Sequence, residues 1–268
     1  MGTRRSRGKD ERQVALAIAV LIKQVPDMGA VKIDRATGKP ILSGQRVVSS
    51  FDEYAIEAAI QLRDAHEGDV TVFCAGPGSA KDAITRALAM GADRGAHIML
   101  ELPEELDSLA LAGLLAEGLK ATEFDLILTG QNSDDYTTGH IGPQVAELLG
   151  LPHVSSVTNI ELEDRRLALH RDTEDGVQHV EVEMPALLMA MTGLNTPRYP
   201  SIKGMMAAKK KPIEQSTPAD VGEQASERIS WGDPFVPERT VTGTIVQDKP
   251  PTEAAQLLVA WLKENRLI

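Results

Sequence analysis

Short, continuous apolar runs alternate along the first half of the chain with segments whose apolar residues recur at helical spacing. The apolar runs cover residues 14–25, 70–75, 96–100 and 124–129. Runs of this length are typical of strands buried on both faces of a sheet. The helical spacing covers residues 55–62, 83–88 and 111–119, and a shorter example follows at 145–149. The pattern predicts an α/β fold, with a mostly parallel sheet and helices on both of its faces.

Capping residues and turns support this arrangement. Residues that favour helix N-termini stand before the first three helical segments: Asp52, Ser79 and Asp107. After Pro152 the pattern changes to two β-type segments, 158–169 and 177–183, on either side of the polar turn 172–176. The change predicts a β-hairpin that extends or flanks the sheet.

The two ends of the chain differ in composition from residues 14–212, which carry the α/β pattern. Residues 1–13 are polar and predict a disordered tail. Residues 213–268 begin with a stretch rich in Pro, Ser, Thr, Gly and acidic residues, which predicts an extended arm. Residues 252–268 then show helical spacing of apolar residues. An amphipathic helix at the end of an arm needs a surface to lie against, so we expect the arm to dock on a partner.

Charge and composition exclude several classes of protein. The chain has 268 residues and a formal net charge of −11, so a general nucleic-acid binder is not expected. Its one cysteine, Cys74, excludes a disulfide framework and a cysteine-ligated cluster held by this chain alone. We find no apolar span of about 18 residues, so the sequence predicts no membrane insertion and a cytoplasmic location.

The polar segment 130–143 is the first candidate for a ligand site. It follows a predicted buried strand and precedes helical spacing, and ligands of parallel sheets bind outside the carboxyl ends of the strands. Its hydroxyls, small residues and backbone N–H groups could hold a phosphate, and Asp135 could cap the next helix or hold a ribose. The alternative is a polar strand-to-helix loop capped by its own side chains. Both interpretations stay open.

Two other turns are expected at the same edge of the sheet. Residues 74–81 contain Gly76 and Gly78 but lack the third glycine of a dinucleotide fingerprint and the Gly-Lys-Ser/Thr end of a P-loop. We interpret them as a tight turn that borders the pocket, which the small polar turn 49–53 could complete. The histidines show no metal-ligand spacing, and neither a Gly-x-Ser-x-Gly elbow nor a catalytic cysteine setting is present. The sequence therefore predicts no catalytic residue and no metal site.

The segment 195–213 combines apolar and cationic residues where a simple loop would need neither. Pro197 and Pro200 flank Arg198 and Tyr199 and stiffen the backbone. A stiff segment of this kind could present apolar side chains to a partner at low ordering cost. The alternative is a helix start packed on its own domain.

Three groups of motifs carry a resemblance to a known family. They are Val20-Leu-Ile-Lys-Gln-Val-Pro-Asp27, Gly76-Pro77 followed by Ala87-Leu-Ala-Met-Gly-Ala-Asp-Arg94, and Asn195-Thr-Pro-Arg-Tyr-Pro-Ser-Ile-Lys-Gly204 followed by Ala208-Lys-Lys-Lys-Pro-Ile213. Together they resemble the beta subunits of electron transfer flavoproteins, heterodimers that carry electrons from flavin dehydrogenases. The resemblance implies an adenine nucleotide alpha hydrolase-like fold and an electron carrier, not a stand-alone enzyme.

The resemblance also implies two nucleotide cofactors. A redox FAD is shared with the alpha subunit and held mainly there, and Asp27 and Met28 would approach it. This chain would hold AMP, or a second FAD in the electron-bifurcating branch. The residues implied for that pocket are Leu21, Ser49, Ser50, Phe51, Asp52, Ala75, Gly130, Gln131, Asn132, Ser133, Asp134, Asp135, Tyr136, Thr137, Thr138 and Gly139.

The same resemblance assigns partners to the two C-terminal regions. The arm 213–268 would dock on the alpha subunit. The recognition loop 195–212 would dock flavin-dependent dehydrogenases such as acyl-CoA dehydrogenases, with Ile202 in the place of an apolar anchor that is usually leucine. The docking residues implied are Arg198, Tyr199, Pro200, Ile202, Met205 and Met206. A quinone oxidoreductase is the implied electron acceptor, and fatty acid oxidation the implied setting.

Some residues depart from the family pattern. Ser49 and Ser50 stand where the family often has Asn-Pro, and residues 132–140 replace the common Gln-Ala-Ile-Asp form. Residues 141–143 resemble the branch with bifurcating members, so AMP and FAD both stay open, as does an NADH-oxidising bifurcating subunit. Two other classes are an ATP-dependent adenylate-type enzyme and a stand-alone nucleotide-binding module. The enzyme would need a Ser-Gly-Gly-x-Asp-Ser loop where 23–27 stands, and the module would have no use for the arm.

Overall fold

A computed structural model of the chain describes residues 15–42, 44–101, 106–222, 228–229, 232 and 243–268. The chain divides into two units, Met1–Asp233 and Pro234–Ile268, which are described separately. The expected disordered tail, residues 1–13, lies outside the described residues, and so do residues 223–227, 230–231 and 233–242 of the expected arm.

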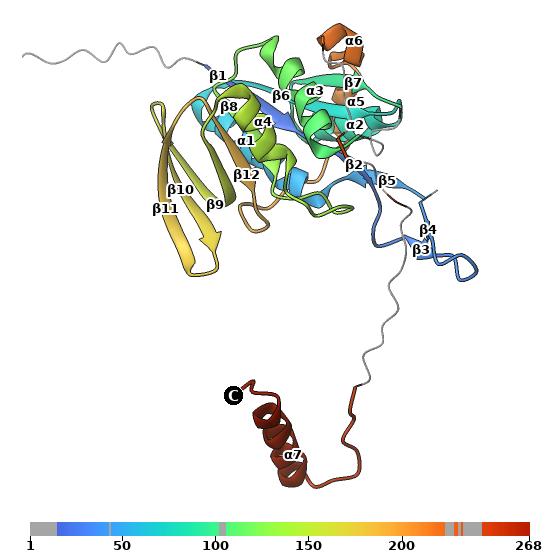
Figure 1. Cartoon of the computed structure of the whole chain (residues 1–268). Coiled ribbons are helices and arrows are strands. Elements are labelled where there is room, and N and C mark those ends of the chain that lie inside the picture. Colours follow the sequence, from blue (N-terminus) through green and yellow to red (C-terminus); the bar gives the residue numbers. More distant parts are fainter. Residues whose placement is uncertain (1–14, 43, 102–105, 223–227, 230–231, 233–242) are drawn as a thin grey trace, which may run out of the picture. The chain divides into compact units, whose positions relative to one another are not determined.

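A nine-stranded sheet with the strand order β11-β10-β9-β12-β8-β1-β6-β7-β13 forms the centre of the first unit (Figure 1). Neighbouring strands in the part β9-β12-β8-β1-β6-β7-β13 are parallel. The two pairs at the other edge, β9 with β10 and β10 with β11, are antiparallel. The strands of this sheet are β1 (Leu16–Leu21), β6 (Gly68–Gly76), β7 (Arg94–Met99), β8 (Leu126–Gly130), β9 (His153–Glu163), β10 (Arg166–Thr173), β11 (Gly176–Glu183), β12 (Ala186–Ala190) and β13 (Ile213–Ser216). The predicted α/β class with a mostly parallel sheet is confirmed.

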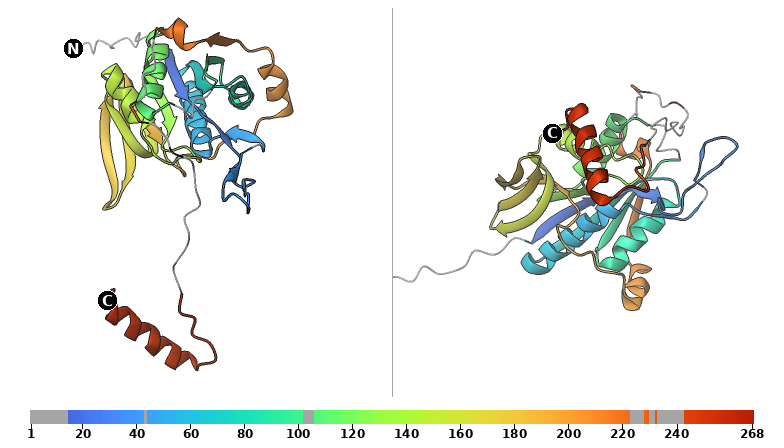
Figure 2. Two further views of the ribbon diagram at one scale, coloured as in Figure 1. Left: turned by 45° about the vertical axis from the view of Figure 1, so that its right-hand side comes forward. Right: turned by 90° about the horizontal axis from the view of Figure 1, so that it is seen from below.

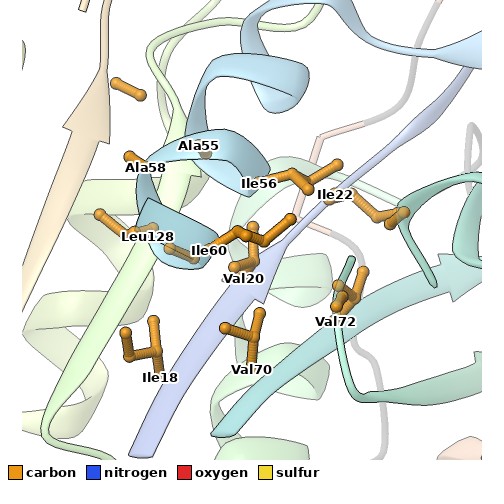
Figure 3. Packing of buried hydrophobic residues seen from close by; sticks show 14 of the residues in the cluster. Ile18, Val20, Ile22, Ala55, Ile56, Ala58, Ile60, Val70, Val72 and Leu128 are labelled. Carbon is orange, nitrogen blue, oxygen red and sulfur yellow. The ribbon is translucent and has the colours of Figure 1, made fainter. Parts of the chain in front are cut away.

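Helices cover both faces of this sheet, as the continuous apolar runs predict (Figure 2). Alternate side chains of β1 explain why: Ile18 and Val20 pack with α1 and α2, whereas Ala19 and Leu21 pack with α3 and α4. Figure 3 shows the first of these two layers, where Ile56 and Ile60 of α1 lie over the strands. The helices are α1 (Ser50–His66), α2 (Ala80–Met90), α3 (Ser108–Lys120), α4 (Ile141–Leu149), α5 (Ile202–Ala208) and α6 (Pro218–Val221).

Two expected strands are divided in the structure. The run 14–25 was expected to be one strand, but the chain leaves the sheet after β1 and continues as β2 (Gln24–Pro26), which pairs antiparallel with β5 (Arg46–Val48). Likewise, 158–169 spans the end of β9 and the start of β10, because the chain turns at Asp164, whose φ is 56°. Aspartate tolerates this left-handed conformation better than most residues. The expected hairpin is thus the outer part of a three-stranded meander that extends the sheet.

A small hairpin of β3 (Lys32–Ile33) and β4 (Pro40–Ile41) was not predicted; it lies between β2 and β5 in the chain. Residues 213–216, which we placed in the arm, instead form β13 at the edge of the main sheet. They pair with β7, from Ile213 opposite Gly95 to Ser216 opposite Ile98.

Of the three predicted helix caps, one is confirmed. Asp107 accepts a hydrogen bond from Ala110 N and caps α3. Ser79 stands at the N-cap of α2, but its hydroxyl donates to Gln24 Oε1 and caps nothing. Asp52 lies inside α1, where its carboxylate bonds to two other segments. The cap predictions for Ser79 and Asp52 are wrong because distant groups take their side chains.

The second unit contains the predicted terminal helix, α7 (Pro251–Glu264). It begins with Pro251 at its first position, where the fixed φ of proline suits a helix start. Among the residues that the structure describes, no helix is long and apolar enough to cross a membrane.

Candidate functional site

The carboxyl ends of the central parallel strands lie next to one another at one edge of the sheet. Leu21 at the end of β1 is in register with Phe73 of β6 and with Thr129 of β8. Gly130 at the end of β8 is in register with Ala190 of β12. The turn 49–52 and the loop 130–139, which sequence analysis assigned to one pocket, meet here through the contacts of two aspartates.

Asp52 joins this edge of the sheet to the first turn of α1. It is buried, and its Oδ2 accepts a hydrogen bond of 2.7 Å from Lys23 N while its Oδ1 accepts one of 3.1 Å from Gly130 N. Gly130 must be glycine, because an added Cβ would lie 2.6 Å from Asp52 Oδ1. Burial, against the favourable effect of both backbone amides, raises the pKa of Asp52 to about 8. Both carboxylate oxygens are thus used inside the protein.

Asp134 joins the loop 130–139 to the same helix. Its two carboxylate oxygens accept hydrogen bonds of 2.7 Å each from Ser50 N and Ser50 Oγ. In return, Asp134 N donates to Ser49 Oγ at 3.2 Å. A carboxylate at this end of a helix is favoured by the helix dipole. The chain's own side chain therefore occupies the anion position at the N-terminus of α1.

Lys23, Asp135 and Tyr136 form a polar cluster beside these two links. Lys23 Nζ lies 2.7 Å from Asp135 Oδ2 and 4.5 Å from the centre of the Tyr136 ring. Asp135 Oδ1 accepts a hydrogen bond from Tyr136 N. The prediction that Asp135 caps the following helix is wrong, since His140 stands at the N-cap of α4 without a side-chain cap. The Tyr136 ring is half exposed at the site.

The remaining loop residues differ in what they offer a ligand. Gln131 fixes the start of the loop to β9 and β12. Its side-chain Oε1 accepts a hydrogen bond of 2.6 Å from Ser156 N, and its backbone N–H donates to Ala190 O. Thr137 and Thr138 are exposed, and Gly139 is half buried. The positive φ of Gly139, 63°, turns the backbone close over Asn132. The exposed end of the loop thus carries hydroxyls and backbone groups, the type of donor that holds phosphate.

Other predicted pocket residues lie deeper in the fold or further along the chain. Leu21 is buried between β6 and β8, so only its backbone can border a ligand. Ala75 lies near the end of β6 and is half buried. Asp27 and Met28 follow β2, where Asp27 N donates to Gln45 O and Met28 is exposed. No described hydrogen bond or ion pair links Asp27 or Met28 to 130–139.

A depression that sequence analysis missed lies between β2, β5 and the start of α2. Its volume is about 670 Å³, and it is lined by Gln24, Leu42, Gly44, Gln45, Arg46, Ser79 and Asp82. Gln24 shapes it, because its Nε2 donates to Ser79 O at 2.6 Å and its Oε1 accepts from Ser79 Oγ at 2.9 Å. One signal was present in the sequence, namely polar Gln24 inside an apolar run. Its partner, 55 positions away, could not be read from the sequence.

Among the described residues, no group of three or more His, Cys, Asp or Glu side chains could hold a metal ion. Cys74 is buried, and burial raises the pKa of its thiol to about 12. A thiol of that pKa stays protonated near neutral pH and is a poor nucleophile. Cys74 is therefore a core residue.

The segment 195–212 combines both interpretations that the sequence left open. Ser201 caps α5, with its Oγ accepting from Gly204 N, and α5 packs so closely on α2 that a Cβ on Gly204 would lie 2.4 Å from Ala89 O. The outer side chains of the segment are nonetheless exposed: Tyr199 by 88%, Ile202 by 76%, and also Met205 and Met206. Pro200 is half buried between them.

Two cationic residues of this segment face its own domain. Arg198 makes an ion pair with buried Glu57 of α1, with Nε to Oε2 at 2.7 Å. Lys211 Nζ donates to Leu88 O, at 3.1 Å, and to Ala92 O, and so holds the end of α2. Arg198 and Lys211 are thus engaged within the fold, whereas Lys209 and Lys210 are exposed.

Comparison with known proteins identifies relatives of nearly the same length. The Electron transfer flavoprotein domain matches residues 41–221. Electron transfer flavoprotein subunit beta of Clostridium acetobutylicum is 35% identical over 257 residues, covering 94% of this chain and 99% of the relative. The subunit of the same name from Bacillus subtilis is also 35% identical, over 93% and 98%. Subunit CarD of the caffeyl-CoA reductase-Etf complex of Acetobacterium woodii is 34% identical, over 94% and 100%.

Proposed function

This chain belongs to the electron transfer flavoprotein beta subunits, and from this premise we propose that it binds an adenine nucleotide and completes a flavin site with an alpha subunit. The assembled heterodimer accepts electrons from flavin-dependent dehydrogenases through the interface FAD and passes them onward. The chain itself contributes walls and contacts, since no catalytic group is found among its described residues.

The link between 49–52 and 130–139 carries the nucleotide part of this proposal. Four hydrogen bonds hold these two segments against each other at the carboxyl edge of the sheet: Asp52 accepts from Gly130 N, Asp134 accepts from Ser50 N and Ser50 Oγ, and Asp134 N donates to Ser49 Oγ. The edge of a parallel sheet is where such folds bind nucleotides. The exposed hydroxyls of Thr137 and Thr138 suit a phosphate, and the half-exposed Tyr136 ring can stack on a base. The donor set fits an adenine nucleotide.

We favour AMP over a second FAD at this position. The anion position at the N-terminus of α1 is filled by Asp134, which leaves the exposed end of the loop for one phosphate group. A second FAD, and with it an NADH-oxidising bifurcating subunit, is the second candidate. Its support is the Ile141-Gly-Pro143 sequence together with the relative that belongs to a caffeyl-CoA reductase-Etf complex.

The redox FAD would lie nearer to the depression beside β2 than to the loop 130–139. Met28, which follows β2 in the chain, is exposed, and Arg46 and Gln24 line the depression. An arginine and backbone amides are suited to a diphosphate, and the exposed apolar side chain to a flavin ring. Bound there, the FAD would supply the reversible electron transfer that the chain's own residues cannot perform.

The alpha subunit is the proposed partner of the terminal arm. Leu258, Val259 and Trp261 lie on α7, and the described part of its own unit holds no other helix or strand that could cover them. An amphipathic helix with an uncovered apolar face is suited to a groove on another protein.

The exposed side chains Tyr199, Ile202, Met205 and Met206 are the proposed contact for dehydrogenases.

Co-expression with an alpha subunit from the same organism tests the proposal. We expect a yellow heterodimer that releases one FAD and one AMP on acid extraction, measured by chromatography and mass spectrometry. Two FAD and no AMP would replace AMP with the bifurcating candidate. A colourless monomer that ignores the alpha subunit, or ATP hydrolysis by the isolated chain, would contradict the proposal as a whole.

A further inference from the structure

Glu57, in the first half of α1, is buried and holds the segment 195–201 through Arg198. The residue as a whole is 3% exposed. It accepts three hydrogen bonds from Arg198: from the backbone N at 3.2 Å, from Nε at 2.7 Å and from Nη2 at 2.9 Å. The Arg198 fork therefore bonds both oxygens of Glu57, the strong bidentate form of the contact.

A second contact fixes the same stretch on the same helix. Asn195 Nδ2 donates to Tyr54 O of α1 at 2.9 Å. Tyr54 and Glu57 are three positions apart and lie next to each other on the helix. Pro197 and Pro200 restrict the backbone between these anchors and α5. The path from Asn195 to Ser201 is thus tied to α1 at two points.

Glu57 and Arg198 differ in exposure, and this difference shows which residue anchors the other. The Arg198 side chain is 40% exposed, whereas that of Glu57 is 4% exposed. Burial alone would raise the pKa of Glu57, but hydrogen bonds from Arg198 and from Gln61 together outweigh it and hold this pKa below its usual value. Loss of the ion pair would leave the buried Glu57 carboxylate without its cation, which is strongly unfavourable, whereas the more exposed guanidinium could be solvated by water. The pair therefore holds Arg198 to the helix.

The side chains that follow Arg198 are exposed and have few contacts of their own to fix them. Tyr199 is the most exposed large hydrophobic residue described, and Ile202 follows it at the first position of α5. Without the Arg198 anchor, the backbone before Ser201 would move, and a partner would bear the cost of ordering it. We infer that Glu57 is a positioning residue for docking: through Arg198 it holds Tyr199 and Ile202 in the arrangement that a dehydrogenase binds.

This inference rests on the proposed docking function and adds a residue that touches no partner. It also changes the role of Arg198, which sequence analysis placed among the docking contacts. In the structure the Arg198 fork faces Glu57, so its main effect on a partner is indirect.

The test uses the purified heterodimer and an acyl-CoA dehydrogenase that is reduced by its acyl-CoA substrate. Electron acceptance is followed as flavin reduction while the heterodimer concentration is varied. We expect Glu57→Gln to raise KM for the heterodimer about tenfold with little change in kcat, since ordering is lost and the flavin is untouched. Glu57→Asp keeps the charge and should recover part of the loss.

Exchange of hydrogen for deuterium gives a readout of the position itself. The peptide that contains residues 195–201 should exchange faster in Glu57→Gln, because the Arg198 N–H loses its charged acceptor, while peptides of β1 and β8 keep their protection. Flavin content should equal that of the wild type.

Two variants separate this effect from a change of charge or fold. Glu181 of β11 makes an exposed ion pair of 3.3 Å with Arg166 of β10. Glu181→Gln removes the same charge as Glu57→Gln and should leave KM unchanged. If Glu57→Gln folds poorly, the double variant Glu57→Gln/Arg198→Gln removes both charges together and should still raise KM. An unchanged KM in folded Glu57→Gln, with Ile202→Asp impaired, would overturn this inference alone. Failure of the wild-type heterodimer to accept electrons would overturn the proposed function itself.

Discussion

Asp134 and Ser50 stand 84 positions apart in the chain, yet the Asp134 carboxylate accepts hydrogen bonds of 2.7 Å from both the N–H and the Oγ of Ser50. The contact makes one unit of the loop after β8 and the first turn of α1. Since Asp52 of the same turn accepts a hydrogen bond from Lys23 N, the segment between β1 and β2 belongs to this unit as well. The geometry of the candidate nucleotide site therefore depends on a few polar contacts.

Asp134→Ala should loosen the candidate nucleotide site. The variant loses two hydrogen bonds to a charged acceptor, so we expect the free energy of unfolding to fall by about 1–3 kcal/mol. AMP retained by the purified heterodimer, measured by mass spectrometry, should fall as well. Asp172→Ala, an exposed carboxylate on β10, serves as the control and should change neither quantity. Full AMP retention in Asp134→Ala would show that this contact does not shape the site.

Asp52→Asn should change how stability depends on pH. Burial raises the pKa of Asp52 to about 8, with the Asp134 charge adding to the rise and Lys23 opposing it. The folded protein therefore holds this proton more tightly than the unfolded chain, and the resulting stability is complete below about pH 4 and lost as pH rises through 8. In the variant one backbone N–H loses its acceptor, which costs about 1–3 kcal/mol.

Urea unfolding of wild type and Asp52→Asn at several pH values separates these effects. The wild type should be more stable at pH 5, and its advantage should shrink toward pH 8 because only the wild type titrates. A constant difference across this range would mean that Asp52 does not take up a proton in the folded protein.

Ile202→Asp should weaken docking without disturbing the fold. Ile202 is exposed at the first position of α5, where a carboxylate is compatible with the helix dipole. A charge buried in a dehydrogenase pocket would be unfavourable, so KM for the heterodimer should rise about 30-fold. Val177→Asp, an exposed apolar position on β11, is the matched control and should leave KM unchanged. Equal rates for Ile202→Asp and wild type would remove Ile202 from the contact.

Lys211→Met should lower stability rather than docking. Lys211 Nζ donates to Leu88 O and Ala92 O at the end of α2, so its loss should lower the free energy of unfolding by about 1–2 kcal/mol. Lys209→Met, at an exposed position of the same basic run, should change stability by less than about 0.5 kcal/mol. Thermal unfolding measures both. A larger effect of Lys211→Met on KM than on stability would restore Lys211 to the recognition surface.

The elements of the fold could be predicted where one local signal defines them. Buried strands such as β6 and β8 have continuous apolar sequences, and α1 to α4 have helical spacing. The break after β1 was missed although the run 14–25 contains polar Lys23 and Gln24. The contact that accompanies the break could not be read from the sequence, because the Lys23 N–H donates to Asp52, 29 positions away. The turn at Asp164 was missed because charged residues on both sides of it also suit an exposed strand.

The candidate site was predicted in outline for a similar reason. The order of strands and turns shows that 49–53 and 130–139 belong to one edge of the sheet, since parallel strands bring their carboxyl ends together. Two side-chain roles differ from those expected, because Asp52 and Asp135 are not helix caps. The ion pair of Arg198 with Glu57 of α1 was not predicted. Gln24 and the depression beside it depend on a contact with Ser79 that no sequence spacing reveals.

The amino-acid sequence by itself determined the α/β class, the apolar character of Ile202 and its neighbours, and the motifs that identify the family. Each of these depends on residues close together in the chain. Only the tertiary structure decided which polar groups are partners, because Glu57 and Arg198 are 141 positions apart and Asp52 and Gly130 are 78 apart. Burial then gives these pairs their effect, since a carboxylate removed from water must find hydrogen bonds within the fold.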